Sequence, residues 1–235
     1  MLLREQCILG IDGSGFSIST GLMDKGIPKG LIYINDGSPG SEILLATIDQ
    51  LLTTLKIRKE KLDGICVTIG PGAFTSLRIS LSVAEALGLG LDIPVYGVNS
   101  LILIAATVPY YPHKIKVIQN AYKGEFYTAS YDTSSGKAVD LDDLKLITPT
   151  DFFDNLAENE LILGNGIELL IKKEFDLIKK NARWNLDFQR TISGIGVIEY
   201  FLDSESRPPS EIPLEPIYIR LSDAEINYAK QFGTG

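Results

Sequence analysis

The sequence predicts a two-lobed α/β protein, and three observations support this fold class. The chain opens with short apolar runs that end in glycine turns, the first of them over residues 7–12. A β-branched run over residues 64–69 enters a Gly-Pro-Gly turn, and a long apolar stretch with helical spacing follows over residues 75–91. The order strand, glycine turn, strand then begins again after residue 115. This restart predicts a second lobe of similar design.

The first lobe is predicted to begin with an antiparallel meander. Its strands are expected at residues 7–12, 17–23 and 31–34, because glycine-containing turns separate these apolar runs. A helix is expected over residues 41–55, where apolar residues recur at helical spacing from Leu44 onward. The meander and this helix together predict one sheet with a helix on its face.

The helix predicted over residues 75–91 is apolar nearly all round. Arg78 and Glu85 are its charged residues, and serine, alanine and glycine recur along it. A helix that is apolar on every side must be covered on every side, so a sheet and one neighbouring helix are not enough. Its small residues predict the close approach of a further helix.

Lobe boundaries follow from the restart of the pattern. The first lobe is predicted to span residues 1–106 and to be joined by the segment 213–235, whereas the second lobe is predicted to span residues 107–212. Strands are expected in the second lobe at residues 115–118 and 125–131.

Composition excludes several classes of function. The chain has 235 residues, with 45% hydrophobic and 22% charged residues, as in an ordinary globular protein. A formal net charge of −8 disfavours it as the main nucleic-acid-binding component. It has a single histidine, His113, and two cysteines, Cys7 and Cys66, which is too few for a zinc site or a histidine-based triad. No signal peptide and no apolar run of about 20 residues is evident, so a cytoplasmic protein without membrane association is expected.

Two glycine turns are candidate anion sites. Asp12, Gly13 and Ser14 precede Gly15 in a turn that is either a tight hairpin or a phosphate loop in which Asp12 orients Mg²⁺. The Gly-Pro-Gly turn at residues 70–72 delivers the chain into the start of a helix that Thr75 or Ser76 is expected to cap. Free N–H groups at such a helix start suit an anion or a carboxylate. The alternative for this second turn is a plain connection between strand and helix.

Four blocks of sequence resemble the TsaB (YeaZ) family. They are Ile8–Ser14, Gly70–Ile79, Gly124–Tyr127 and Glu215–Arg220, in this order, and Gly-Pro-Gly-x-Phe-Thr-x-Leu-Arg is the specific one. The resemblance implies an α/β, two-lobed actin/Hsp70-like (ASKHA, ribonuclease H-like) fold with mixed sheets flanked by helices. It also implies a non-catalytic scaffold that serves the formation of N6-threonylcarbamoyladenosine at position 37 of tRNAs reading ANN codons.

The resemblance further implies partners and sites. The chemistry belongs in that family to a catalytic paralogue, TsaD, which pairs with TsaB through the helices of its first lobe, and a TsaE-like ATPase joins them. A homodimer is expected when the chain is alone, tRNA contact is expected only indirectly, and no catalytic residue or metal is expected. Asp12, Gly13 and Ser14 become a degenerate phosphate loop with no required cofactor and at most weak ATP or ADP binding. The expected partner interface consists of Glu42, Leu45, Ile48, Arg78, Leu81, Ala84, Glu85 and Gly88.

The sequence departs from the family pattern at three places. Ser76 replaces a glycine, Asn120 and Tyr122 replace an aspartate and an arginine, and residues 40–42 replace a histidine at the start of the first long helix. The alternative function is an active ASKHA-type phosphotransferase, such as a small sugar or acetate kinase. That alternative needs a carboxylate in the second lobe, for which Asp132 and Asp154 are the candidates.

Overall fold

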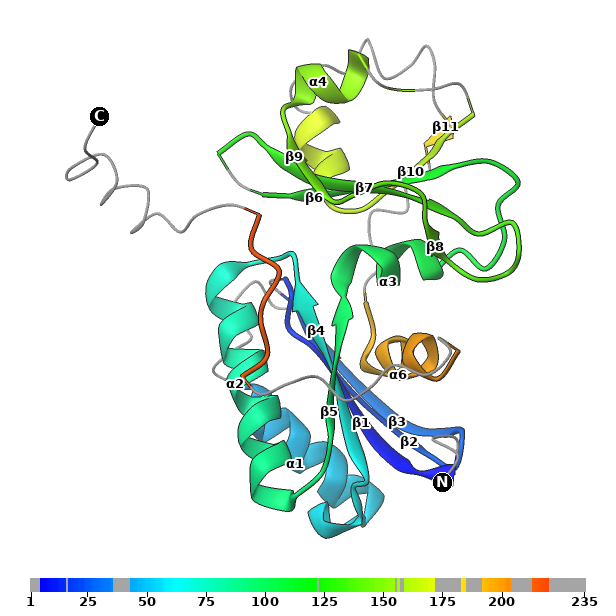
Figure 1. Cartoon of the computed structure of the whole chain (residues 1–235). Helices are drawn as coiled ribbons and strands as arrows, with labels where there is room; N and C mark the ends of the chain where they lie inside the picture. Colours follow the sequence, from blue (N-terminus) through cyan, green and yellow to red (C-terminus); the bar gives the residue numbers. More distant parts are fainter. Residues whose placement is uncertain are drawn as a thin grey trace, which may run out of the picture.

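Two mixed sheets lie one above the other, and a helix between them connects the two halves (Figure 1). The computed structural model describes residues 5–15, 17–35, 43–121, 123–154, 156, 159–171, 183–184, 192–203 and 213–219.

The first sheet has the order β3-β2-β1-β4-β5. Its strands are β1 (Cys7–Asp12), β2 (Ile18–Asp24), β3 (Ile27–Ile34), β4 (Gly64–Gly70) and β5 (Val95–Asn99). The first three strands form the predicted antiparallel meander, and β4 and β5 run parallel to β1. β3 begins four residues earlier than the predicted Leu31, because Lys25 and Gly26 make a two-residue turn with positive φ at both positions.

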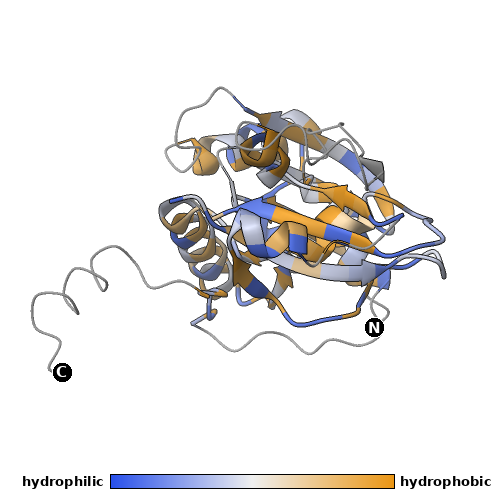
Figure 2. Ribbon diagram, turned by 90° about the horizontal axis from the view of Figure 1, so that it is seen from above, coloured by the Kyte–Doolittle hydropathy of each residue, from blue (hydrophilic) through white to orange (hydrophobic). Residues whose placement is uncertain are grey.

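Helices cover both faces of this sheet. The predicted helices are present as α1 (Leu44–Leu55) and α2 (Phe74–Leu91), which share one apolar core with one face of the sheet. Lys59–Lys61 form a short 3₁₀ turn. On the other face lies α6 (Gly194–Asp203), which packs on β1 and β2. The helices in Figure 2 each carry both hydrophobic and hydrophilic residues, as expected for helices that have one buried and one exposed face.

The second sheet repeats the design of the first. Its elements are β6 (Ile115–Asn120), β7 (Phe126–Asp132), β8 (Val139–Asp140), β9 (Lys145–Ile147), α4 (Pro149–Asp154), β10 (Leu161–Leu163) and β11 (Arg183–Trp184). β6 and β7 are antiparallel, as β1 and β2 are, and β10 and β11 run parallel to β6, as β4 and β5 run parallel to β1. The repeat that the sequence predicts after residue 115 is therefore confirmed.

The helix α3 (Ser100–Ala106) lies between the two sheets (Figure 1). Asn99 caps it, as its side chain accepts a hydrogen bond from the Leu101 N–H at 2.8 Å. Five consecutive residues of α3, from Leu101 to Ala105, are buried in a core that also contains residues of both sheets. The two lobes therefore share one continuous core around α3.

The position of α6 bears on the predicted lobes. Residues 194–203 fall within the range 107–212 predicted for the second lobe, yet they pack on the first sheet. Gly194 lies so close that an added Cβ would reach the Gly10 carbonyl oxygen at 2.6 Å, and one at Gly21 would reach the Gly194 carbonyl carbon at 2.8 Å. Backbone-to-backbone contact of this kind requires glycine, so three glycines fix α6 on the first sheet.

One helix of the described part is long and apolar enough to cross a membrane by composition alone. This helix is α2, whose residues Ser76, Leu77, Ser80, Leu81, Ala84 and Gly88 are buried within the chain. Its contacts with β4 explain its apolar character as that of a core helix.

Candidate functional site

The first candidate site is built around the carboxylate of Asp12 at the end of β1. Its Oδ1 accepts hydrogen bonds from the Ser14 N–H at 3.1 Å, the Ser14 hydroxyl at 2.8 Å and the Thr68 hydroxyl at 2.9 Å. Thr68 lies on the neighbouring parallel strand β4 and also contacts the Gly13 N–H, at 3.4 Å. Thr68 is not among the site residues predicted from the sequence, although a polar residue inside an otherwise apolar strand is a signal that could have identified it.

Residues of the Gly-Pro-Gly turn and of α2 pack closely against the turn that follows Asp12. The Ser14 carbonyl accepts a hydrogen bond from the Ala73 N–H at 2.8 Å, and an added Cβ at Gly72 would overlap that carbonyl. An added Cβ at Gly13 would overlap the hydroxyl of Ser80 on α2. The glycines of both turns therefore permit the two turns and α2 to pack on one another, which is a structural role.

Burial raises the pKa of the Asp12 carboxyl, while the hydrogen bonds from Ser14 and Thr68 act in the opposite direction. Burial is the larger effect, so the neutral form is favoured relative to an exposed aspartate.

The second turn leads into α2 without the predicted cap. The N-cap residue is Ala73, and no side chain bonds to the free N–H groups there, so the expectation that Thr75 or Ser76 caps the helix is wrong. Ser76 is buried in the first turn of the helix instead. Gly70 has φ of +99°, a conformation that L side chains rarely adopt, which explains why glycine ends β4.

Residues 213–219 run along α2 and form hydrogen bonds with this helix and with β4 (Figure 1). The Ile217 N–H donates to the Ile69 carbonyl at 2.8 Å, and the Leu214 N–H donates to the Glu85 carboxylate. Leu214 itself is buried in the core of the first lobe. The sequence predicts that a segment from residue 213 joins this lobe, and the described residues of that segment do pack there.

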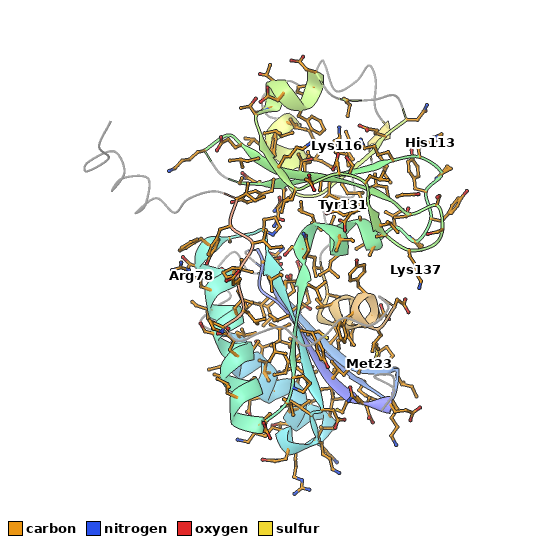
Figure 3. All side chains as sticks on the ribbon, in the orientation of Figure 1. Met23, Arg78, His113, Lys116, Tyr131 and Lys137 are labelled. Atoms are coloured by element: carbon orange, nitrogen blue, oxygen red, sulfur yellow. The ribbon has the colours of Figure 1, made fainter. Side chains whose placement is uncertain are left out.

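An aromatic cluster anchors the far end of the same segment. The rings of Phe74 and Tyr218 are 5.1 Å apart, and the Arg78 guanidinium lies 4.1 Å from the centre of the Phe74 ring. Arg78 Nε donates to the Tyr218 hydroxyl at 2.7 Å. Arg78 projects from the outer side of α2 (Figure 3), so the Arg78 side chain fastens the segment to the helix.

The expected partner interface needs correction at four positions. Ile48, Leu81 and Ala84 are buried in the core of the first lobe. Gly88 is also buried, and an added Cβ there would overlap Val95. These residues face the sheet and cannot meet a partner. The sequence could not reveal this, because a helix that is apolar all round has no polar face to define its orientation.

The remaining interface predictions divide into three groups. Leu45 is 59% exposed on α1 and is available to a partner. Arg78 and Glu85 bind the segment 213–219. Glu42 lies outside the described residues. The outward face of α2 instead presents Ser82, Ala86 and Leu89, of which Leu89 is 67% exposed.

The remaining polar candidates make local contacts. Among the described residues, no group of three or more His, Cys, Asp or Glu side chains is placed to hold a metal ion. The rings of His113 and Tyr111 form a T-shaped pair with their centres 5.8 Å apart, and the Asn120 N–H donates to the Asn165 side chain at 2.8 Å. Asp132 accepts a hydrogen bond from the Ser134 N–H in a turn. Asp154 is exposed at the end of α4. Neither of these two carboxylates, which are the candidates for the phosphotransferase alternative, therefore lies at the end of β6, the strand that corresponds to β1.

Two mixed sheets with the same strand order, joined through a central helix, define a two-lobed protein of the actin/Hsp70-like (ASKHA) class, with ribonuclease H-like sheets. A YeaZ-like protein from Pseudomonas aeruginosa has this fold with a TM-score of 0.71 at 19% identity, over 92% of this chain and 100% of that one. YeaZ from Pseudomonas aeruginosa matches with a TM-score of 0.67 at 19% identity, over 83% of this chain and 90% of that one. At this identity the likeness establishes the fold.

Sequence comparison gives the family. Residues 40–196 match the family model TsaD, described as tRNA N6-adenosine threonylcarbamoyltransferase. TsaB of Bacillus subtilis is 26% identical over 226 residues, which are 94% of this chain and 97% of that protein. The tRNA N6-adenosine threonylcarbamoyltransferase of Tropheryma whipplei is 46% identical over 61 residues, which are 26% of this chain and 15% of that enzyme. The chain belongs to the TsaD family, and within it to the TsaB (YeaZ) proteins.

Proposed function

We propose that the protein is a non-catalytic scaffold subunit of the assembly that forms N6-threonylcarbamoyladenosine in tRNA. The similarity to TsaB along nearly the whole chain supports the pathway. The observation that carries the non-catalytic role is the hydrogen bonding of the Asp12 turn, because the N–H groups of Gly13 and Ser14, which a phosphate loop would direct at a phosphate, donate to the side chains of Thr68 and Asp12. No cofactor is required in this proposal, and ATP or ADP binding at Asp12–Ser14 is at most weak.

The proposed partner is a TsaD-like catalytic paralogue. Short stretches of threonylcarbamoyltransferases match this chain at up to 46% identity, so the two proteins share structural elements. The proposed contact is the outward face of α1 and α2, which includes Leu45, Ala86 and Leu89. Exposed apolar residues on neighbouring helices are a usual feature of a protein interface. A TsaE-like ATPase completes the assembly in the cytoplasm, tRNA is contacted through the partners, and the same face supports a homodimer when the chain is alone.

The proposed role is tested by reconstitution. We expect the purified chain alone to show no ATPase, sugar kinase, acetate kinase or peptidase turnover. Added to a TsaD-like protein, a TsaE-like ATPase, threonylcarbamoyl-AMP and tRNA, it should raise the yield of the modified nucleoside, measured by mass spectrometry of digested tRNA. Asp12→Asn should support the same yield. Turnover by the chain alone that Asp12→Asn abolishes would contradict the scaffold and support the phosphotransferase.

The proposed interface is tested at Ala86. Ala86→Arg places a long charged side chain on the exposed face of α2 without entering the core, and we expect at least a tenfold loss of affinity for a TsaD-like protein by calorimetry. Ala84→Arg is unsuitable because Ala84 is buried. Thr150→Arg, which makes the same charge change at an exposed position of α4, is the control and should bind normally. Equal affinities for the two variants would place the interface elsewhere.

A further inference from the structure

The C-terminal end of the described chain is fixed beside the first turn of α2. Tyr218 packs against Phe74, with the two ring centres 5.1 Å apart, and its hydroxyl accepts a hydrogen bond from Arg78 Nε at 2.7 Å. The segment 213–219 therefore runs antiparallel to α2 and ends at the amino-terminal end of this helix (Figure 1). Residues 220–235 follow from this point.

An exposed stripe on α2 begins at the same place. It continues from Arg78 through Ser82, Ala86 and Leu89, whose spacings of three and four residues place them on one side of the helix. All four residues are exposed, so no described element covers this side of α2, and Leu89 is 67% exposed. Ser82 and Ala86 are small, and an added Cβ at Gly90 would meet nothing within 4 Å. A further helix can therefore approach α2 closely here.

The last residues of the chain carry the sequence signals of a helix. Ser222 and Glu225 have the spacing of a capping box, in which each side chain bonds to the backbone N–H of the other residue. Leu221 and Ile226 have the spacing of the hydrophobic staple that accompanies such a box, and Gly233 stands where a helix commonly ends. These residues lie outside the described part of the chain, so the helix is a prediction from the sequence.

The predicted helix is amphipathic, and its length matches the exposed stripe on α2. Its apolar residues recur at spacings of three and four and share one side: Leu221, Ala224, Tyr228 and Phe232. At 1.5 Å per residue, a helix over residues 222–232 and the stripe from Arg78 to Leu89 each extend about 16 Å. The chain therefore continues from one end of the stripe into an apolar helix of matching length.

We propose that residues 221–233 form a helix that docks on the outward face of α1 and α2 and competes with a protein partner for this face. Residues 220 and 221 reverse the direction of the chain, so that the helix runs parallel to α2 and its apolar side covers Leu89. Docking removes apolar surface from water, and attachment to the same chain gives the helix a high local concentration. The docking is independent of the proposed scaffold role, whereas the competition rests on the proposed partner interface.

A nitroxide spin label on the C-terminal segment of the full chain tests the docking. Asn227→Cys places a thiol away from the apolar side of the predicted helix. The label reacts there selectively, because Cys7 and Cys66 are buried and burial raises the pKa of both thiols. We expect the label to broaden the amide signals of residues 78–89 and to leave those of α4 unchanged.

A mixture of two samples identifies the molecule to which the docked helix belongs. When the spin label and the isotope label are on separate molecules, the broadening of residues 78–89 should disappear. Broadening that persists in the mixture would assign this face to the C-terminal segment of a second copy. Absence of broadening in both samples would show that the face stays open. Either result would overturn the proposal.

A matched pair of variants tests the competition. Tyr228→Asp places a charge on the apolar side of the predicted helix, and Asn227→Asp introduces the same charge at the adjacent position outside that side. A helix that occupies the face in about nine molecules of ten lowers partner affinity about tenfold. We therefore expect Tyr228→Asp to bind a TsaD-like protein about tenfold more tightly by calorimetry, and Asn227→Asp to bind as the unmodified chain does. Equal affinities for the two variants would overturn the competition.

Ala86→Arg separates the docking from the partner interface. In a chain with Tyr228→Asp the C-terminal segment no longer competes, so Ala86→Arg then tests the partner interface alone. Weaker partner binding in that chain, with no effect of Tyr228→Asp by itself, would keep the interface and overturn the docked helix. Loss of the spin-label broadening in Ala86→Arg, with unchanged partner affinity, would support the docked helix and place the partner elsewhere.

Discussion

At the scale of single residues, Asp12 occupies a position that is typical of a phosphate loop, but its side chain forms hydrogen bonds that stabilise the fold. The carboxylate joins β1 to β4 through Thr68 and closes its own turn through Ser14. All of these bonds reach Oδ1, and the neighbouring turn and α2 fill the space beside Gly13. From the sequence alone, the same aspartate, glycine and serine are compatible with a phosphate loop, because the residue types of one segment do not show which other segments pack against it.

Asp12→Asn should stabilise the protein at neutral pH. Burial raises the pKa of Asp12, so between the ordinary pKa and the raised one the folded chain binds more protons than the unfolded chain. Stability contributed by this group is therefore present at low pH and lost as the pH rises through that window. Each pH unit by which the pKa is raised costs about 1.4 kcal/mol at neutral pH. Urea unfolding from pH 4 to 8 should show a smaller loss for Asp12→Asn than for the unmodified chain.

Asp132→Asn is the control of opposite sign. Hydrogen bonds from Ser134 lower the pKa of this exposed carboxyl, so its contribution is present above the ordinary pKa and lost as the pH falls. The variant should be slightly less stable at neutral pH. Equal pH profiles for Asp12→Asn and the unmodified chain would contradict the effect assigned to burial.

Glu160 is the centre of a second residue-level prediction. It is buried with its carboxylate 3.2 Å from Lys116 Nζ and 3.4 Å from Lys114 Nζ. Glu160→Gln removes the charge that balances the buried Lys116, and we expect a loss of about 3 kcal/mol in unfolding free energy. Lys114 is about one-third exposed, and Lys114→Met should cost less than about 1 kcal/mol. Both values can be measured by urea unfolding, and a smaller loss for Glu160→Gln than for Lys114→Met would contradict the assignment.

At the scale of elements, the contact of α6 with the first sheet depends on glycine. Gly194→Ala would force its Cβ into the backbone of β1 and β2, and we expect at least about 3 kcal/mol of destabilisation in thermal unfolding. Gly90→Ala is the matched control, because Gly90 lies on the exposed side of α2 with nothing within 4 Å of an added Cβ. It should gain about 0.5–1 kcal/mol from helix propensity. A tolerated Gly194→Ala would require a different packing of α6.

The sequence predicts most elements but not the side that each one buries. Strand and helix positions follow from alternating or helical apolar spacing, and α2 begins within one residue of its predicted start. The orientation of α2 does not follow from that spacing, so the interface predicted from the sequence includes Ala84, although Ala84 is buried in the core of the first lobe. The contact of Tyr218 with Arg78 joins residues 140 positions apart, and such distant contacts leave no local pattern.

At the scale of the whole molecule, the core around α3 joins both lobes. Ile102 is buried there with residues of both sheets, among them Cys66 and Val117. The lobes should therefore unfold as one cooperative unit. Ile102→Ala should lower the opening free energy of β4 and of β6 by the same amount, about 3 kcal/mol, in native-state hydrogen exchange. A decrease confined to one sheet would show that the lobes are independent.

The two-lobed plan and the Asp12 turn could be predicted from the sequence, because repeated strand and turn patterns are local. The cleft lined by α3, by the turn between β7 and β8 and by α6 could not be predicted from the sequence. These segments are distant in sequence, and Lys137 and Asp203, which form a hydrogen bond there, are brought together only by the fold. The same reason explains the predicted assignment of residues 194–203 to the second lobe: chain order suggests it, whereas three glycines bring α6 to the first sheet.

The placement of α6 has a consequence for synthesis on the ribosome. β1 and β2 emerge early, but the helix that covers their second face is made only after both sheets have been translated. During that interval the nascent first lobe presents Gly10, Gly21 and the apolar residues around them without their cover. We therefore expect the growing chain to bind chaperones that hold exposed apolar strands, and to need them no longer once residues 194–203 have left the exit tunnel and docked.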